Sequence, residues 1–396
     1  MLGPTLRGAA LGFTAGYALV RGLQAMRDLG TPYAARPHRD PVRYGKARRA
    51  LALAGTARAV ASVATVAFVA GDPLERALRR LPRPLRAPLF TLAVLCVETV
   101  ADLGTEYVED HVLERVFATS DRSAAAWLND RAKGTGVGLA VTAILVSLAD
   151  ALVNFAPRRW PWIAVAAAPP LLAFATVVAP TFILPMFNRY EPVGGDLEQR
   201  IRALATRYGV GDAAILRFDM SRQTKKANAF VTGVLGTERI VLGDTLVDAF
   251  PTDETLFVVA HELGHYVRRD PWLGIGLGTL ALGVTLFAAN GALRATTGKG
   301  VSSPAQGARL AFYALLAQLV LTPAGNAASR ALEGRADRFA LDATGERSAG
   351  IATFRRLAQQ NLAEVAPPRW AEILFASHPS LATRISALES AVDRGV

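Results

Sequence analysis

The sequence has very little of the residue that cross-links proteins and binds soft metals. Cys96 is the one cysteine among 396 residues, which excludes an internal disulfide and a zinc site built from cysteines. Because Cys96 lies in an apolar stretch, we predict a thiol packed in the protein core. Charged residues are also scarce, at 19% against 51% hydrophobic residues. Since the apolar residues gather in long runs, this composition indicates a membrane protein.

Acidic residues are outnumbered by basic ones, 33 against 44, which gives a formal net charge of +11. Most of the basic residues are arginines that lie beside the apolar runs, as in the stretch 43–49. No base-stacking or groove-reading module accompanies them, so we exclude nucleic acid as a partner. Arginines next to membrane spans contact anionic lipid headgroups instead. The arginine bias, with abundant alanine and glycine, points to a bacterial genome.

Seven apolar runs are long enough to cross a membrane as helices. They cover residues 8–26, 51–70, 87–103, 136–155, 163–187, 272–293 and 308–322, the last extended past Pro323 into the helix that follows. Glu98, Asp102 and Asp150 are acidic residues within these runs. Carboxylates are costly in hydrocarbon, so we expect these three to face protein or a water-filled cavity. The stretch 104–133 is polar and amphipathic, which predicts an exposed helical connection.

Two segments have the charge and periodicity of a globular domain. In the first, 188–270, residues 196–208 predict an amphipathic helix, and 214–218 and 239–242 have strand character. The second segment runs from residue 324 to the C-terminus and is helical.

These segments give the predicted organisation of the chain. We expect a mainly α-helical, polytopic membrane protein whose residues 1–187 contain five transmembrane helices. Residues 188–396 form the second domain, which has a small β-sheet and is interrupted by a two-helix transmembrane hairpin at about 272–322. Two crossings return the chain to the side it left, so both water-facing pieces can meet at one site.

The first water-facing piece carries the pattern HExxH at His261, Glu262 and His265. Because positions i and i+4 share one helix face, both imidazoles can reach one metal ion, and Glu262 can take a proton from water. Imidazole suits zinc, and a catalytic zinc has three protein ligands and one open position. The third ligand is then a His or Glu from elsewhere. The alternative is a pair of structural core histidines, but a chance HExxH is rare in a chain with five histidines.

A second motif supplies the missing ligand. Glu333 and Asp337 are again at positions i and i+4, so one helix face offers two carboxylates. One can bind zinc while the other accepts the second N–H of a zinc-bound imidazole. Taken alone, these residues fit a solvated helix face paired with Arg330 and Arg338. Together with HExxH, they favour a metal site on a zincin-like catalytic domain.

The sequence resembles the integral-membrane CAAX prenyl proteases (type I), a group of gluzincin metallopeptidases. The resemblance rests on HELGH, on the ExxxD motif after two further spans, and on four other stretches from about Glu106 onward. These stretches are 127–133, 185–190, 227–233 together with 239–246, and 377–384. In the first three spans only number and hydropathy agree.

The resemblance implies the ligands of one zinc ion per chain. His261, His265 and Glu333 would bind the metal, and Glu262 would be the general base. Asp337 would hold a zinc-bound histidine from outside the coordination sphere.

The resemblance also implies how a substrate is held. His378 would lie opposite Glu262 and stabilise the oxyanion. Asn228 would bind the substrate backbone along an exposed strand edge. Arg384 would order the same substrate pocket.

The predicted activity is hydrolysis of peptide bonds in membrane-associated or prenylated CAAX-type substrates. A quality-control protease of the same chemistry is one alternative, and a transporter or scaffold with a structural zinc is another. We expect a multi-pass protein of the bacterial inner membrane, in contact with membrane lipid, whose site faces the cytosol. The cytosolic side is taken from the resemblance. The arginines do not decide the orientation, because the basic stretches 43–49 and 71–86 lie at opposite ends of one span. Natural substrate, cleavage position and oligomeric state stay open.

Overall fold

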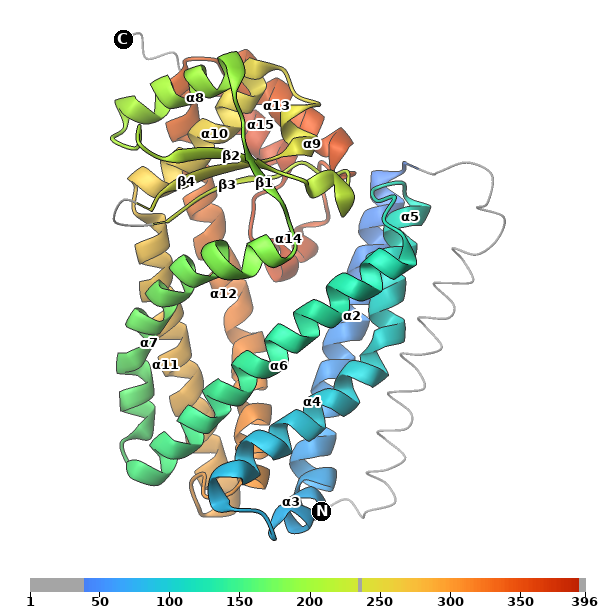
Figure 1. The fold of residues 1–396 in the computed structure, drawn as a ribbon, viewed down its shortest axis with the longest axis vertical. Coiled ribbons are helices and arrows are strands. Elements are labelled where there is room, and N and C mark those ends of the chain that lie inside the picture. The colour runs from blue at the N-terminus through green and yellow to red at the C-terminus, as the bar shows by residue number, and fades with distance from the viewer. Residues whose placement is uncertain (1–38, 234–236, 392–396) are drawn as a thin grey trace.

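The computed structural model describes residues 39–233 and 237–391 and confirms a mainly helical membrane architecture (Figure 1). Six helices in this part of the chain are long and apolar enough to cross a membrane. They span Pro41–Leu78, Arg83–Val116, Ala124–Phe155, Trp160–Met186, Asp270–Thr297 and Pro304–Thr344. The predicted span at 8–26 lies outside the described residues.

The helix that contains the second apolar run, 51–70, extends beyond that run at both ends. Helix α2 (Pro41–Thr65) begins inside the basic stretch because Asp40 caps it, accepting hydrogen bonds from the backbone N–H of Val42 and Arg43 at 3.0 and 3.1 Å. It continues through a π-helical turn, Val66–Ala70, into α3 (Gly71–Leu78). The arginines of the stretch 43–49 therefore lie on a helix.

The other membrane helices are α4 (Arg83–Tyr107), α6 (Ala124–Phe155), α7 (Trp160–Val178), α11 (Asp270–Thr297) and α12 (Pro304–Thr344). In Figure 1, α6 crosses diagonally from the α2–α4 pair to the group formed by α7, α11 and α12. A cavity of about 380 Å³ lies among these helices, and Glu98 and Asp150 line it as predicted. Asp102 instead pairs with Arg58 of α2.

Cys96 does not lie in the core. Its side chain is exposed on α4, next to Val97 and Val100, which are 70% and 76% exposed. In a membrane helix the apolar face that would be buried in a soluble protein faces lipid instead. The prediction of a packed thiol was wrong because apolar surroundings in the sequence do not distinguish lipid from protein.

The globular part begins after α7 and contains a four-stranded sheet. Its strands are β1 (Tyr190–Pro192), β2 (Ala214–Phe218), β3 (Ala229–Thr232) and β4 (Arg239–Gly243), in the order β1-β2-β4-β3. Strands β2 and β4 are parallel, whereas the two outer pairs are antiparallel. Strand β3 is therefore an edge strand.

Helices pack on this sheet to form the main hydrophobic core. They are α8 (Gly195–Arg207), α9 (Asp244–Val247), α10 (Thr252–Val267), α13 (Arg347–Gln360) and α15 (Leu381–Glu389), while α14 (Arg369–Phe375) lies below them in Figure 1. Leu242 of β4 and Leu263 of α10 are fully buried in this core, and so is Ile201 of α8. Each such buried side chain stabilises the folded state by about 1.5–3 kcal/mol.

A second, smaller core joins the membrane helices to the globular part and corrects the prediction for 104–133. Helix α4 continues through a π-helical turn, Val108–Val112, into α5 (Leu113–Val116). Leu113 and Phe117 are buried there with Tyr44 and Leu51 of α2 and Leu362 of the C-terminal region. The stretch is helical as expected, but much of it is packed rather than exposed, because two other segments cover its apolar face.

Glu114 is the polar centre of this junction. The Tyr44 hydroxyl donates to its Oε1 at 2.5 Å, and Lys226 Nζ lies 2.9 Å from its Oε2. Thr119 donates a third hydrogen bond. Lys226 directly precedes the segment leading to β3, so this buried carboxylate connects α2 and α5 to the edge of the sheet.

We expect Glu114→Ala to lower the thermal stability of the detergent-solubilised protein. The change leaves Lys226 and Tyr44 without their buried acceptor, which costs about 2–3 kcal/mol after allowance for the partial exposure of Lys226. The melting temperature of each variant measures the effect. Asp253→Ala is the matched control, because its ion pair with Arg200 is exposed. Equal melting temperatures for both variants would contradict the role of Glu114.

Candidate metal centre and active site

Helix α10 presents the HExxH residues at the centre of the globular part. Its acidic first turn, with Asp253 and Glu254, suits the positive end of the helix dipole. Its other end packs closely against α12, because Gly264 has no side chain: a Cβ there would lie 3.0 Å from the ring of Phe339. This close approach brings the carboxylates of α12 to the histidines of α10.

Three side chains converge at this contact. His261 Nε2 lies 3.2 Å from His265 Nε2 and 3.2 Å from Glu333 Oε2. His265 Nε2 lies 3.4 Å from Glu333 Oε1. One ligand atom from each residue lies within 4.8 Å of the others. The structure thus brings together the three residues predicted as metal ligands.

The donor set fits a divalent cation such as zinc. Zinc–nitrogen bonds of 2.0–2.1 Å in a tetrahedron imply ligand atoms separated by about 3.3 Å, close to the distances between these three side chains. Glu333 Oε2 is buried and makes no hydrogen bond. A buried carboxylate oxygen without a donor is costly, and a cation between the three ligands would satisfy it.

The ring of His261 is held on its other side by Asp337. His261 Nδ1 lies 2.9 Å from Asp337 Oδ1, and Asp337 also accepts hydrogen bonds from Arg384 Nε, at 2.8 Å, and Nη2, at 2.5 Å. An Nδ1–H that donates to Asp337 leaves the Nε2 lone pair directed at Glu333. Arg384 therefore contacts Asp337 directly, and its predicted role in ordering the substrate pocket stays a prediction.

His265 has a corresponding partner that the sequence reasoning missed. Its Nδ1 lies 2.9 Å from Oδ2 of Asp270, and Arg335 Nη2 donates to Oδ1 of Asp270 at 3.2 Å. Asp270 is five residues after His265, a spacing that does not share a helix face. It reaches the ring because Arg269 adopts a left-handed conformation, φ 58°, between α10 and α11. The one sequence signal for this contact was the presence of an acidic residue shortly after HExxH.

The electrostatics of the centre also favour a cation. Burial alone favours neutral imidazole, but the neighbouring carboxylates of Asp337 and Glu333 outweigh it and raise the pKa of His261 to about 9. In the metal-free protein a proton therefore sits where a metal would bind, and metal and proton compete for the ring. Burial also raises the pKa of the Glu262 carboxyl above its ordinary value, which makes it a stronger base.

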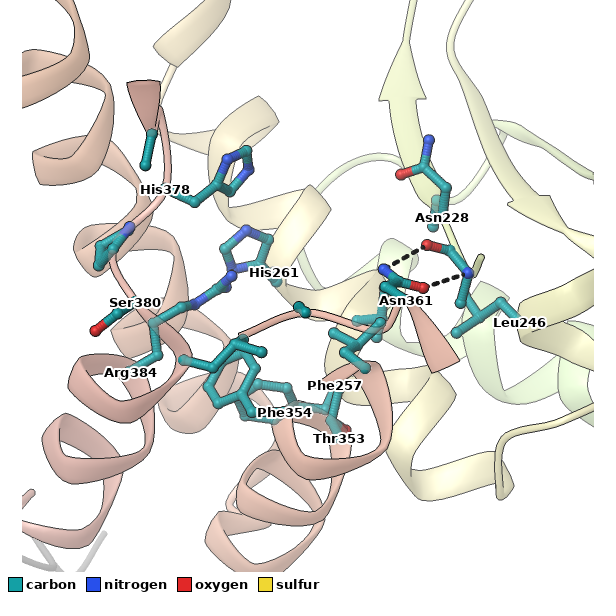
Figure 2. Close-up of a pocket in the computed structure, with 18 of the residues that line it drawn as sticks. Asn228, Leu246, Phe257, His261, Thr353, Phe354, Asn361, His378, Ser380 and Arg384 are labelled. Atoms are coloured by element: carbon teal, nitrogen blue, oxygen red, sulfur yellow. Dashed lines mark hydrogen bonds between the residues drawn. The ribbon is translucent and has the colours of Figure 1, made fainter. Parts of the chain in front are cut away.

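The centre opens into a pocket of about 410 Å³. His261, Glu262 and Arg384 line it, and so do the predicted substrate residues Asn228 and His378. Figure 2 shows Asn228 at the start of β3 and His378 on the opposite side, next to His261. His378 Nε2 lies 3.3 Å from Glu333 Oε1. All the predicted site residues thus lie at one pocket or directly around it.

Comparisons with known proteins match both halves of the chain. The sequence profile of peptidase family M48 matches residues 193–392. The profile described as CAAX prenyl protease N-terminal, five membrane helices, matches residues 40–189. An uncharacterised metalloprotease of Bacillus subtilis, YhfN, is 27% identical over 76% of this chain and 72% of its own length. CAAX prenyl protease 1 of Saccharomyces cerevisiae is 33% identical, but over 44% of this chain and 39% of its own length.

The whole fold also has a counterpart among solved structures. The crystal structure of S. mikatae Ste24p matches with a TM-score of 0.75 and 21% sequence identity, and the match covers 98% of this chain and 99% of that one. At this identity the likeness concerns the fold. Together with the HExxH residues and the converging carboxylate of Glu333 on α12, the profile matches show that the chain belongs to peptidase family M48, among the membrane metallopeptidases of the CAAX prenyl protease group.

Proposed function

We propose that this metallopeptidase uses one zinc ion to cleave membrane-associated peptides, including lipidated peptides of the CAAX type. The observation that carries the proposal is the convergence of His261, His265 and Glu333 beside Glu262, at a pocket open to peptide. The ligand spacing supports zinc, and the names of the relatives support the substrate class.

Each side chain has a defined task in the proposed reaction. Zinc, when bound by His261, His265 and Glu333, supplies a Lewis acid that polarises the scissile carbonyl and makes water acidic. Glu262 accepts the proton of the attacking water and delivers it to the leaving amine. His378 donates an N–H to the developing oxyanion.

The charge states support these assignments. Desolvation, aided by the positive charge of Arg384, lowers the pKa of His378 despite the attraction of Glu333. His378 is therefore neutral at pH 7, with an N–H to donate. Asp337 orients His261 and Asp270 orients His265, so both rings keep the tautomer that binds metal.

We propose that the peptide adds to the free edge of β3 as a further strand, with Asn228 holding its backbone. Asn228 is exposed at the start of this edge strand and lines the pocket. Added strands gain main-chain hydrogen bonds that do not depend on side chains, which suits a protease with several substrates.

We further propose the organisation and orientation of the chain. Residues 1–187 form the membrane region, and 188–396 form the peptidase domain with its inserted hairpin. Membrane lipid surrounds the exposed apolar helix faces, and the site faces the cytosol of a bacterial inner membrane. The arginines at the start of α2 support this side, because Arg49 pairs with Glu364 of the globular part at 2.7 Å and arginines favour the cytosolic face.

The test is cleavage by purified protein in detergent. The substrates are a quenched fluorescent farnesylated CAAX peptide, the same peptide without the farnesyl group, and an unfolded membrane protein. We expect cleavage of the farnesylated peptide, loss of cleavage after chelation, and recovery with one zinc per chain.

The three substrates separate the alternatives. Cleavage of the unfolded protein alone would replace the proposal with a quality-control protease. A protein that binds one zinc per chain and cleaves none of them would instead be a transporter or scaffold with a structural metal.

A further inference from the structure

The free edge of the segment that contains β3 is already hydrogen-bonded at one position, Ala227, to a side chain of the same protein. The carbonyl of Asn228 accepts a hydrogen bond from Gly243 of β4 at 2.8 Å. Because main-chain groups alternate along a strand, those of Ala227, Ala229 and Val231 point away from β4, toward the free edge. Among the residues that the structure describes, no hydrogen bond engages the outward groups of Ala229 and Val231.

The Asn361 side chain binds both outward groups of Ala227. Its Oδ1 accepts from Ala227 N at 2.7 Å, and its Nδ2 donates to Ala227 O at 3.3 Å. Figure 2 shows these two bonds as dashed lines beside Asn228. A carboxamide paired with one N–H and one C=O reproduces the contacts that a neighbouring strand would make.

Asn361 is held firmly in this position. It follows α13, and the next residue, Leu362, adopts a left-handed conformation with φ 50°. The Leu362 side chain is buried in the second core with Tyr44. Gln360 Nε2 donates to Lys225 O at 2.6 Å, which ties the same turn to the segment before β3. The Asn361 amide is thus a fixed end of the edge rather than a mobile surface group.

We propose that Asn361 is a specificity-determining residue that ends the substrate-pairing edge and so sets the register of the bound peptide. The inference rests on the proposed addition of substrate to β3. Antiparallel pairing is the more stable arrangement, so the C-terminal part of the peptide points toward Ala227. Because Asn361 binds the main-chain groups of Ala227, the peptide can pair with β3 only as far as Ala229. Peptide residues beyond that point receive no main-chain hydrogen bonds from this edge.

The consequence is a limit on the length of substrate that follows the scissile bond. Outward-facing positions on a strand repeat every two residues. Removal of the Asn361 amide would expose one more pairing position and admit a peptide whose C-terminal side is two residues longer. Ala363 and Glu364 line the same pocket just beyond Asn361, so the turn also narrows the space for a longer chain.

The experiment compares farnesylated peptides whose C-terminal side carries zero to four added residues, with products identified by mass spectrometry. For the wild type we expect kcat/KM to fall about tenfold once two residues are added, because their main-chain groups enter the pocket without hydrogen-bond partners, at a cost of about 1.4 kcal/mol. Asn361→Ala should recover most of that loss and give new products shifted by two residues.

The controls separate this inference from the proposed function and from misfolding. Gln360→Ala removes a bond of the same turn without touching the edge, so it should leave the products unchanged. Asn361→Asp keeps the side chain in place as acceptor for Ala227 N, so its product shift should be smaller than that of Asn361→Ala. Wild type that cleaves short and extended peptides equally well, or an active, zinc-loaded Asn361→Ala with wild-type products, overturns the inference. Wild type that cleaves no peptide overturns the proposed function instead.

Discussion

Replacing Glu333 by alanine is expected to abolish both metal binding and peptide cleavage. Glu333 is buried, its Oε2 makes no hydrogen bond, and its two oxygens lie 3.2 and 3.4 Å from the histidine nitrogens. Two imidazoles alone leave the coordination sphere half empty, so zinc affinity should fall below the level that survives purification. Metal content per chain and cleavage of the farnesylated peptide measure the two effects.

The matched control for Glu333→Ala is Asp342→Ala, an exposed carboxylate on the same helix. It should retain one zinc per chain and wild-type activity. Melting temperatures of both variants show whether α12 has kept its place. Full zinc occupancy in Glu333→Ala would show that the third ligand lies elsewhere.

Glu262→Gln is expected to separate metal binding from catalysis. The amide keeps the size of the side chain, and Glu262 is not one of the three converging ligands, so zinc content should stay at one per chain. The amide cannot accept the proton of the attacking water, so kcat should fall by about 10³-fold. Steady-state kinetics with the farnesylated peptide measure kcat, and KM should change little because the pocket is intact.

An exposed carboxylate on the same helix provides the comparison for Glu262→Gln. Asp253→Asn should leave both kcat and zinc content unchanged. Glu262→Gln with near-normal kcat would mean that another group accepts the proton. Loss of zinc in Glu262→Gln would mean that the carboxylate helps to hold the metal.

The sequence predicted those parts of the site that depend on local spacing. His261 and His265 share a helix face, and so do Glu333 and Asp337, because four residues complete about one helical turn. That the two helices meet followed from the need for a third ligand and from the family resemblance. The close contact itself depends on Gly264 against Phe339, a pairing between positions far apart in the sequence.

The missed features depend on contacts between distant segments. Asp270 reaches His265 through a left-handed residue at a helix junction, and Asn361 reaches Ala227 across 134 positions. Neither contact produces a periodic pattern of residues in the sequence. Cys96 was misplaced because apolar neighbours indicate burial without saying whether protein or lipid buries the residue. The start of α2, by contrast, could have been found from Asp40 and Pro41, which together form a helix N-terminal signal.

The position of Glu333 near the far end of α12 has a consequence for biosynthesis. A chain is made from its N-terminus, so the HExxH helix leaves the ribosome before the two membrane spans that separate it from Glu333. If Glu333 is the third metal ligand, the peptidase stays inert until both spans have been inserted and α12 has returned beside α10. A chain that is truncated or inserted with the hairpin misplaced holds no complete centre. With Glu333 in this role, hydrolytic activity would be confined to molecules that have finished assembly in the membrane.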